Sequence, residues 1–291
     1  MTYSIVARDA RSGELGVAVQ SHYFQVGPVV PWARAGVGAV ATQSMVDVRY
    51  GPIGLELMRA GRPAAAALAA AIAADEEPEV RQVAMVDAEG RVAAHTGSRC
   101  IAAAGHRTGD GYSVQANLML RATVWDRMAE AFEAAEGPLA ERLLAAMEAA
   151  EADGGDIRGR QSAAILVVTG QPSGRWWEDR LIDLRVEDHP EPIPEMARLL
   201  RLKRAYDAEE ESEYELALKL APEKTEIKAW AAFNFAEAGR MDEAARLFSA
   251  AVAEQPAWIE TMRRLVAAGR LEARIAEELE RRAGALSARP R

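Results

Sequence analysis

The order of strand-like and helix-like segments in the first two-thirds of the chain restricts its fold more than any other feature. Residues 2–7 and 15–19 alternate in character and are separated by a glycine-containing turn, which indicates a β-hairpin. Pairs of helix-like segments interrupt the later strands twice, and this order predicts an α+β fold in which helices cover both outer faces of two stacked sheets. The other predicted strands are 36–43, 82–86, 91–95, 162–168 and 177–186, and the predicted helices lie at 53–58, after Pro63, and at 123–135 and 138–152.

The sequence changes in character near residues 188–194. Pro190, Pro192 and Pro194 predict an extended connector, because proline removes a backbone donor and disfavours a helical residue before it. Beyond Met196 the chain is acidic and its pattern predicts helices. We therefore place a boundary between a domain of residues 1–205 and a helical module of residues 206–291.

The helical module contains an internal period of 34 residues, the length of a tetratricopeptide repeat. The paired residues are Tyr214 and Phe248, Ala217 and Ala251, and Pro222 and Pro256. The alternative is a set of packing helices with coincidental spacing. Because the module is short, we expect an apolar face that a neighbour covers, either in a homo-oligomer or through a peptide partner. The residues of this expected face are Tyr214, Trp230, Phe235 and Phe248.

Charge and composition exclude several classes of function. The net charge of −9 disfavours binding to nucleic acid or to an anionic membrane, since both surfaces repel an acidic protein. There is no recognisable signal peptide or membrane-spanning run, and the single cysteine, Cys100, permits no internal disulfide, so we expect a cytoplasmic protein. Cys100 is either a buried thiol or a nucleophile. The four histidines lack the spacing of a zinc site, and we expect no metal and no cofactor.

Three polar clusters interrupt the apolar pattern. They lie at residues 20–22, at 95–97 together with 110–117, and at 155–162. Each is either a ligand-binding loop or a solvated surface loop. The first 202 residues contain no lysine, so lysine supplies neither a base nor a Schiff base there, and arginine does not accept a proton at ordinary pH.

Thr2 offers a different kind of chemistry. A methionine that precedes a small residue is normally removed, which would leave a hydroxyl and a free α-amino group on Thr2. That amine, whose ordinary pKa is about 8, can accept the hydroxyl proton and return it later, so one residue is both nucleophile and base. Backbone N–H groups near Gln43 and Ser44, or the Asn117 side chain, are candidates to stabilise the oxyanion. The alternative is that the chain begins Met-Thr for no catalytic reason.

Several separate stretches resemble one bacterial family. They are TYSIVARDARSGELGVAVQS, VPWARAGVGAVATQS, RVAAHTG, GDGYSVQANLM, GDIRGRQSAAILVV and DLRVEDHPEP, and together they are similar to the family catalogued as domain of unknown function 1028, over about residues 2–200. That family is placed in the N-terminal nucleophile (Ntn) hydrolase-like superfamily. The resemblance implies a four-layer αββα sandwich and amide hydrolysis by an N-terminal Thr, Ser or Cys without cofactor or metal, and Thr2 falls on that position.

The sequence departs from the proteasome-type members of that superfamily, which use an aspartate after the second strand and a lysine on the next. Gln20 stands near the aspartate position, and no lysine fills the other. We therefore expect either an amidohydrolase for a small amide or peptide-like substrate, or a binding or scaffold protein whose helical module recruits a peptide or cell-wall partner. The catalytic candidates are Thr2, Asn117 and Ser44, and the substrate-binding candidates are His22, Gln20, Gln43, His95, Arg158, Arg160 and Gln161.

Overall fold

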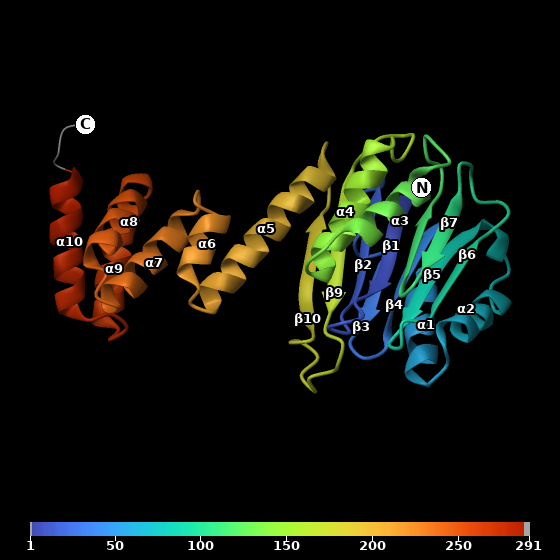
Figure 1. Cartoon of the computed structure of the whole chain (residues 1–291), viewed down its shortest axis with the longest axis horizontal. Coiled ribbons are helices and arrows are strands. Elements are labelled where there is room, and N and C mark those ends of the chain that lie inside the picture. Colours follow the sequence, from blue (N-terminus) through green and yellow to red (C-terminus); the bar gives the residue numbers. More distant parts are fainter. Residues whose placement is uncertain (1, 288–291) are drawn as a thin grey trace. The chain divides into compact units, whose positions relative to one another are not determined.

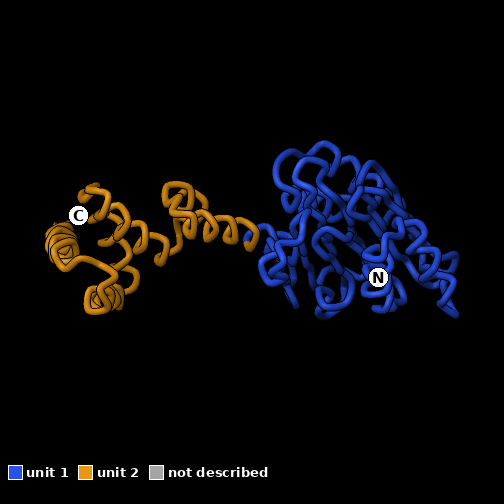
Figure 2. The backbone as a smooth tube through the Cα atoms, turned by 90° about the horizontal axis from the view of Figure 1, so that it is seen from below, with its two compact units in different colours: residues 1–198 blue, residues 199–291 orange. Residues whose placement is uncertain are grey.

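The chain consists of two compact units, residues 1–198 (unit 1) and residues 199–291 (unit 2), which Figure 2 shows in different colours. The structure is a computed structural model that describes residues 2–287. Unit 1 contains both β-sheets, and unit 2 is helical.

Unit 1 is built on an antiparallel six-stranded sheet with the strand order β10-β9-β2-β1-β8-β7. The hairpin of β1 and β2 lies near its centre, and Thr2 is paired with Ser21, which in turn is paired with Ser162. The strands are β1 (Thr2–Arg8), β2 (Leu15–Ser21), β7 (Gly105–Gly109), β8 (Tyr112–Ala116), β9 (Ser162–Val168) and β10 (Arg180–Val186).

A second antiparallel sheet of four strands, in the order β3-β4-β5-β6, faces the first. Helices α1 and α2 pack against its outer face, and α3 and α4 pack against the outer face of the six-stranded sheet, so that helix, sheet, sheet and helix follow one another (Figure 1). The α+β class and the two sheets expected from the sequence are confirmed. The elements are β3 (Pro31–Arg34), β4 (Gly38–Ser44), β5 (Arg81–Asp87), β6 (Val92–Thr96), α1 (Tyr50–Arg59), α2 (Ala64–Ala73), α3 (Val124–Ala134) and α4 (Leu139–Ala152).

Helix α2 illustrates how the sequence fixes a local element. Within the helix, all seven residues at 64–67 and 69–71 are alanine, the residue with the highest helix propensity. Pro63 stands immediately before the helix. The buried carboxylate of Asp87 accepts a hydrogen bond of 3.0 Å from the backbone N–H of Ala64. This bond satisfies one of the free donors at the start of the helix and ties α2 to the end of β5.

The core between the two sheets is apolar over most of its length. Small and branched side chains from both sheets meet there, among them Val6, Val17, Ala41 and Val86. A separate apolar cluster that includes Leu68 and Met85 joins α1 and α2 to the four-stranded sheet. Burial of side chains of the size of valine or leucine contributes roughly 1.5–3 kcal/mol each to folding.

The sequence patterns do not predict β3, β7 or β8, and β8 lies within the polar cluster at residues 110–117. Residues 112–116 are all buried, with Ser113 and Gln115 alternating with apolar neighbours. The alternation has the period of a strand, but its polar side chains face the other sheet and its apolar side chains face the helices, so the pattern resembles that of a strand with one solvated face.

The predicted extended connector at residues 188–194 is wrong for residues 192–194, which are helical, whereas residues 188–191 lie outside the helices and strands. Helix α5 (Pro192–Glu210) begins at Pro192 and includes Pro194 in its first turn. Proline is accepted there because the first backbone N–H groups of a helix have no partner within the helix. Helix α5 therefore runs through both the predicted boundary after residue 205 and the division between the two units after residue 198.

Unit 2 continues with helices around an aromatic core. These are α6 (Tyr214–Leu220), α7 (Thr225–Glu237), α8 (Met241–Glu254), α9 (Ala257–Ala267) and α10 (Ala273–Ser287). Ala217 and Ala251, which are 34 residues apart, are both fully buried, but α6 has 7 residues and α8 has 14. Within residues 2–287, no helix is both long enough and apolar enough to cross a membrane.

The predicted apolar face in the helical module is not left open. Phe235 and Phe248 are buried within unit 2, and Tyr214 and Trp230 pack against the same cluster. Tyr214 also meets Phe235 edge-on at 6.3 Å between ring centroids. The later helices of the unit, α9 and α10, supply Met262 and Leu279 to this cluster and so provide the cover that the sequence assigned to a neighbour.

A chain that ends at Arg204 is expected to retain the fold of unit 1, because both sheets and α1 to α4 lie within residues 1–198. The measurement is thermal unfolding of the truncated chain, followed by circular dichroism and compared with the full chain. We expect a cooperative transition for the truncated chain. A truncated chain without such a transition would show that unit 1 requires unit 2 to fold.

Candidate active site between the two sheets

The core between the sheets becomes polar at the end where β1 begins and β4 ends. Seven inward-facing polar side chains gather there, each with at most 4% of its surface exposed. We call this group the inter-sheet polar zone, and its members are Thr2, Ser4, Ser21, Gln43, Gln82, Gln115 and Asn117. Because burial of polar groups is costly without hydrogen-bond partners, a concentration of this kind is a candidate functional site.

Strand periodicity and register bring these residues together. Thr2 and Ser4 lie on the same face of β1 as Val6, which belongs to the apolar core between the sheets. Gln115 of β8 is paired with Ser4, and Gln82 of β5 is paired with Gln43 of β4. The two pairs belong to different sheets, so they meet only because the sheets stack face to face.

Gln82 connects the amide side chains of the zone. Its Oε1 accepts hydrogen bonds from Gln43 Nε2 at 2.7 Å and from Asn117 Nδ2 at 2.8 Å. Its Nε2 donates to Thr96 Oγ1 at 2.9 Å and to the carbonyl oxygen of Ala116 at 2.9 Å. Gln82 therefore holds the side chains of Gln43 and Asn117 in fixed orientations. It was missed as a site residue because it lies within an ordinary predicted strand.

A second set of bonds joins the two sheets through Ser4. Ser4 Oγ donates to Gln43 Oε1 at 2.7 Å and accepts from Gln115 Nε2 at 2.6 Å. Gln115 Oε1 in turn accepts from Ser113 Oγ at 2.9 Å. The donors and acceptors are thus matched along a chain from β8 through β1 to β4, which fixes the positions of these side chains.

Thr2 lies at the edge of this network. Its Oγ1 donates to Ser21 Oγ at 3.0 Å, and its backbone nitrogen lies 3.2 Å from the carbonyl oxygen of Asn117. Its carbonyl oxygen accepts bonds of 3.3 Å from both Gln43 Nε2 and Asn117 Nδ2. Among the described residues, the hydrogen-bond partners of Thr2 are thus all uncharged. Two of the predicted site residues, Gln43 and Asn117, reach it directly.

Asn117 has unused hydrogen-bonding capacity. It is fully buried, and its Oδ1 has no hydrogen-bond partner among the described residues. Buried polar atoms are nearly always paired, so an unpaired acceptor beside Thr2 indicates a position where a water molecule or a ligand would bind.

Gln20 does not reach the inter-sheet polar zone. Neighbouring residues of a strand point to opposite faces, and because Ser21 points toward Thr2, Gln20 points toward the layer of α3 and α4. It is fully buried, its amide has no partner among the described residues, and it is paired with Tyr3 across the sheet. Tyr3 donates to Glu151 Oε1 at 2.5 Å, and burial, reinforced by the charge of Glu151, raises the pKa of the Tyr3 hydroxyl.

The predicted arginines lie in the loop before β9, where each forms an ion pair within the protein. Arg158 donates two hydrogen bonds to Asp156, from Nε to Oδ1 at 3.1 Å and from Nη2 to Oδ2 at 2.7 Å. Arg160 is paired with Glu151. His22 Nδ1 lies 3.3 Å from the carbonyl oxygen of Arg160, so the structure brings these three predicted residues together. The charges of Arg158 and Arg160 therefore already have partners within the protein.

The other predicted residues have separate surroundings. His95 Nε2 lies 2.8 Å from the carbonyl oxygen of Pro78, and Gln161 Nε2 donates to Asp188 at 3.1 Å. Ser44 ends β4 in the left-handed region, with φ of 74°. The following N–H, of Met45, donates to the carbonyl oxygen of Val80 at 3.3 Å. At this end of β4 it is therefore the side chain of Gln43, rather than the next backbone N–H, that contacts Thr2.

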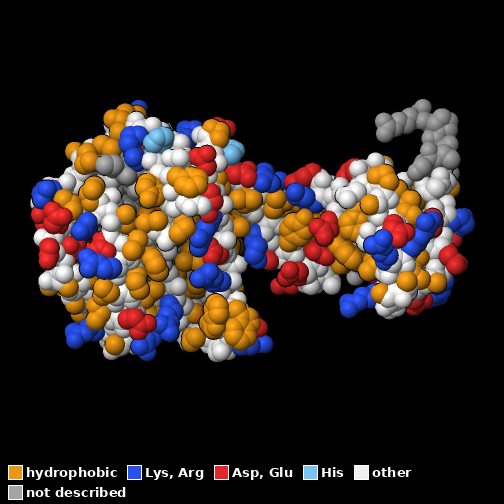
Figure 3. Space-filling view, turned by 180° about the vertical axis from the view of Figure 1, so that it is seen from behind, with side chains coloured by type: hydrophobic (Ala, Val, Ile, Leu, Met, Phe, Trp, Pro, Cys, Tyr) orange, Lys and Arg blue, Asp and Glu red, His pale blue; other side chains and the backbone are white. Residues whose placement is uncertain are grey.

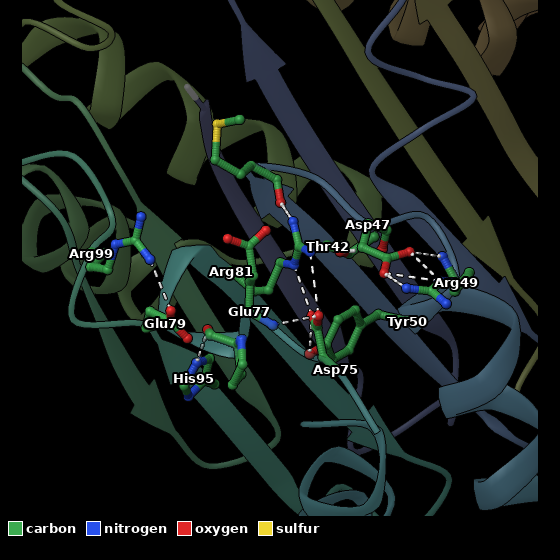
Figure 4. A network of polar contacts seen from close by, with 12 residues as sticks. Thr42, Asp47, Arg49, Tyr50, Asp75, Glu77, Glu79, Arg81, His95 and Arg99 are labelled. Carbon is green, nitrogen blue, oxygen red and sulfur yellow. Dashed lines mark hydrogen bonds and ion pairs between the residues drawn. The ribbon is translucent and has the colours of Figure 1, made fainter. Parts of the chain in front are cut away.

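An ion-pair network fixes the loop that follows Ser44. Figure 4 shows Arg81 and Tyr50 directed toward Asp75, with bonds of 2.8 Å from Arg81 Nε and 3.0 Å from the Tyr50 hydroxyl to Asp75 Oδ2. Arg81 also donates to the carbonyl oxygen of Met45 at 2.7 Å. The Arg81 guanidinium holds the pKa of the Asp75 carboxyl far below its ordinary value. Arg81 adjoins Gln82, so this network supports the strand ends that carry the inter-sheet polar zone.

Large apolar side chains are exposed on the loops at the same end of the sandwich. These side chains lie in the loops that follow β2, β4, β6 and β8 and in the loop that precedes β9. Figure 3 shows hydrophobic side chains at this end of unit 1, which is uppermost in the view. Because these side chains gather at one end of unit 1, the loops are a candidate contact surface. Its members are Tyr23, Phe24, Met45, Val46, Val48, Ile101, Leu120 and Ile157.

Comparison with known proteins adds a family to this geometry. Residues 2–196 match the family of unknown function DUF1028. No curated protein matches the chain. Among solved structures, the chain is similar to the crystal structure of protein SPO2555 from Silicibacter pomeroyi, which carries the same family name. The two sequences are 30% identical, the TM-score is 0.62, and the match covers 69% of this chain and 88% of that one. Since the family match spans more than half of the chain, the protein belongs to the DUF1028 family.

Proposed function

We propose that the protein is an N-terminal nucleophile hydrolase that cleaves a small amide or peptide-like substrate at Thr2. The observation that carries this proposal is the position of Thr2, which lies almost completely buried at the edge of a polar network and has its hydroxyl 3.0 Å from Ser21. The four layers of unit 1 support the same assignment, as does the resemblance of its sequence to a family that is placed in the Ntn hydrolase-like superfamily.

In this proposal the amine of Thr2, freed by removal of residue 1, accepts the proton of Thr2 Oγ1. The oxygen then attacks the carbonyl carbon of the substrate, and the resulting oxyanion is stabilised by amide N–H donors. The side-chain amides of Asn117 and Gln43 are the candidate donors. Each donates to the Thr2 carbonyl oxygen at 3.3 Å and to Gln82 Oε1, so the oxyanion would take the place of one of these acceptors. The amine returns its proton to the leaving nitrogen, and water hydrolyses the acyl-threonine ester.

The surroundings of Thr2 differ from those of the proteasome-type nucleophile, because none of its hydrogen-bond partners among the described residues carries a charge. In the proposal the α-amine of Thr2 is itself the base, and its ordinary pKa of about 8 leaves a fraction of it neutral at neutral pH. The proposal therefore does not require the lysine and aspartate that the proteasome-type enzymes use, both of which are missing at the corresponding positions.

We expect the protein purified from its native host to lack residue 1. The physical reason is that Thr2 is small enough for the preceding methionine to be removed, and its amine is required for the proposed proton transfer. The measurement is the intact mass. Complete retention of residue 1 would exclude the mechanism in its simple form.

A covalent probe tests the proposed nucleophile directly. The processed protein is incubated with a β-lactone, which acylates an activated hydroxyl, and the modified residue is located by peptide mapping. We expect modification at Thr2, and a protein that retains residue 1 serves as the matched control and should remain unmodified. Modification of both forms to the same extent, or at another residue, would contradict the proposal.

A binding or scaffold function is the second candidate. The apolar side chains exposed on the loops at the Thr2 end favour it, because they offer a contact surface without any requirement for a free amine. Retention of residue 1 together with failure of the β-lactone to react would favour this function over hydrolysis.

A further inference from the structure

A cavity of about 290 Å³ lies at the end of the sandwich remote from the inter-sheet polar zone. Strand β9 begins beside that zone at Ser162 and ends at Val168, which lines the cavity. The other walls come from the end of β3 and from the connection between β9 and β10. The lining residues used below are Arg34, Pro172, Trp176, Asp179 and Arg180.

The connection that forms one wall is held by its own hydrogen bonds. The backbone N–H of Thr169 donates to the carbonyl oxygen of Asp179 at 2.9 Å, and the N–H of Ser173 donates to Asp179 Oδ1 at 2.8 Å. Pro172 lies so close to Gly36 that a Cβ at that glycine would come within 2.7 Å of the proline ring. The wall is therefore formed before any ligand binds, which reduces the entropy that binding must overcome.

Two tryptophans project from this connection. Trp176 is 73% exposed and Trp177 is 62% exposed, and their rings meet edge-on with centroids 5.9 Å apart. Only Trp176 lines the cavity. Figure 1 places the β9–β10 connection at the lower end of unit 1, and Figure 3 shows hydrophobic side chains protruding at the lower edge of that unit. Large aromatic surfaces left open to water in this way are typical of binding sites.

The polar groups of the cavity include both donors and an acceptor. The guanidinium groups of Arg34 and Arg180 are donors, and the carboxylate of Asp179 is an acceptor. Arg34 is paired with Glu56 at 2.7 Å and Arg180 with Asp183 at 2.9 Å. Both arginine side chains are more than half exposed, so these pairs hold them only weakly. An anion would match the arginines and be repelled by Asp179, whereas a hydroxyl group, which donates and accepts, matches all three.

We propose that this cavity binds a saccharide. One pyranose ring would lie with its flat C–H face against the indole of Trp176, whose negative ring face attracts the positive edges of C–H bonds. Hydroxyl groups at the edge of the sugar ring would donate to Asp179 and accept from Arg34 and Arg180. The volume is at the lower end of the range for small-molecule sites, which suits a single ring. This site is independent of the proposed hydrolysis at Thr2.

The test is isothermal titration calorimetry of the full chain with cellobiose, xylobiose and N,N′-diacetylchitobiose, whose equatorial substituents leave both ring faces flat. We expect binding of at least one of them, and Trp176→Ala should weaken it by about tenfold or more, as loss of a central aromatic contact does. Trp177→Ala is the matched control, since it removes the same side chain from the same connection but not from the cavity, and it should weaken binding by less than about threefold. Both substituted side chains are mostly exposed, so thermal unfolding should be unchanged.

Three outcomes would overturn the proposal. The first is the absence of binding by all three disaccharides at about 10 mM, a concentration that detects even weak sites. The second is tighter binding of phenyl phosphate than of any saccharide, lost in Trp176→Ala, which would show a site for a flat anion. The third is an oligomer of the wild-type chain, detected by sedimentation, that dissociates in Trp176→Ala while no saccharide binds to either protein. That result would show that the cavity is an interface between copies of this chain.

Discussion

Thr2→Ala is expected to abolish amide hydrolysis by the processed protein while the fold is retained. The substitution removes the hydroxyl that attacks the substrate, and loss of a nucleophile typically lowers kcat by about 10³-fold or more. Among residues 2–287, the side-chain hydrogen bond that the substitution removes is the one to Ser21, so the free energy of unfolding should fall by about 1 kcal/mol. The measurements are the rate of hydrolysis of a peptide-like amide and thermal unfolding of the same sample.

Thr2→Ser and Cys100→Ala are the controls for this experiment. Thr2→Ser keeps a hydroxyl and an α-amine on residue 2, so part of the activity should remain. Cys100 Sγ donates to the carbonyl oxygen of Arg81 at 3.2 Å, and Cys100→Ala should leave the rate unchanged if the thiol has no part in the reaction. Wild-type activity in Thr2→Ala would place the reaction elsewhere, with Cys100 or Ser4 as the next residue to test.

Asp75→Ala is expected to lower the free energy of unfolding by about 2–3 kcal/mol, which lies between the small effect of exposed ion pairs and the large effect of breaking buried ones. The Asp75 side chain is only 4% exposed and that of Arg81 15% exposed, and the substitution leaves the guanidinium with one fewer partner. It also removes the acceptor for the Tyr50 hydroxyl and for the backbone N–H of Glu77. Urea unfolding at pH 7 measures the change, and Glu56→Gln, in an exposed ion pair, is the matched control that should have little effect.

The effect of Asp75→Ala should depend on pH in a defined direction. The Arg81 guanidinium lowers the pKa of the Asp75 carboxyl, so its stabilising contribution is complete above the unfolded-state pKa of about 3.9 and is lost as the pH falls below it. The difference between wild-type protein and Asp75→Ala should therefore shrink in acid. A difference that stays constant from pH 7 to about pH 3 would show that the carboxylate charge is not its source.

This network also connects the stability of unit 1 to the candidate active site. Arg81 holds the carbonyl oxygen of Met45 just after β4, and Gln82, the next residue in the chain, orients Gln43 and Asn117 beside Thr2. We therefore expect loss of Asp75 to reduce hydrolysis as well as stability, since the amide donors would be held less firmly.

Local patterns were sufficient to predict much of unit 1. The alternation in residues 2–7 and 15–19 predicted the β1–β2 hairpin, and the apolar run at 162–168 matches β9. Helices α3 and α4 lie within one residue of their predicted limits, because they are amphipathic or alanine-rich and are bounded by Thr123, Pro138 and a pair of glycines after α4. Such signals lie within a few residues of one another and therefore can be read along the chain.

The sequence alone determined the α+β class of unit 1, the helical character of unit 2 and the choice of Thr2, Gln43 and Asn117 as candidates. The tertiary structure decided what surrounds them. Ser4 meets Gln43 and Gln82 meets Asn117 only after the two sheets stack, and these contacts join residues 39 and 35 positions apart. In the same way, the register that places Ser21 opposite Thr2 turns Gln20 to the other face of the sheet, and the folded loop pairs Arg158 with Asp156. Contacts between sheets depend on long-range packing, and a pattern with a period of two or 3.6 residues specifies the faces of each element but not which faces meet.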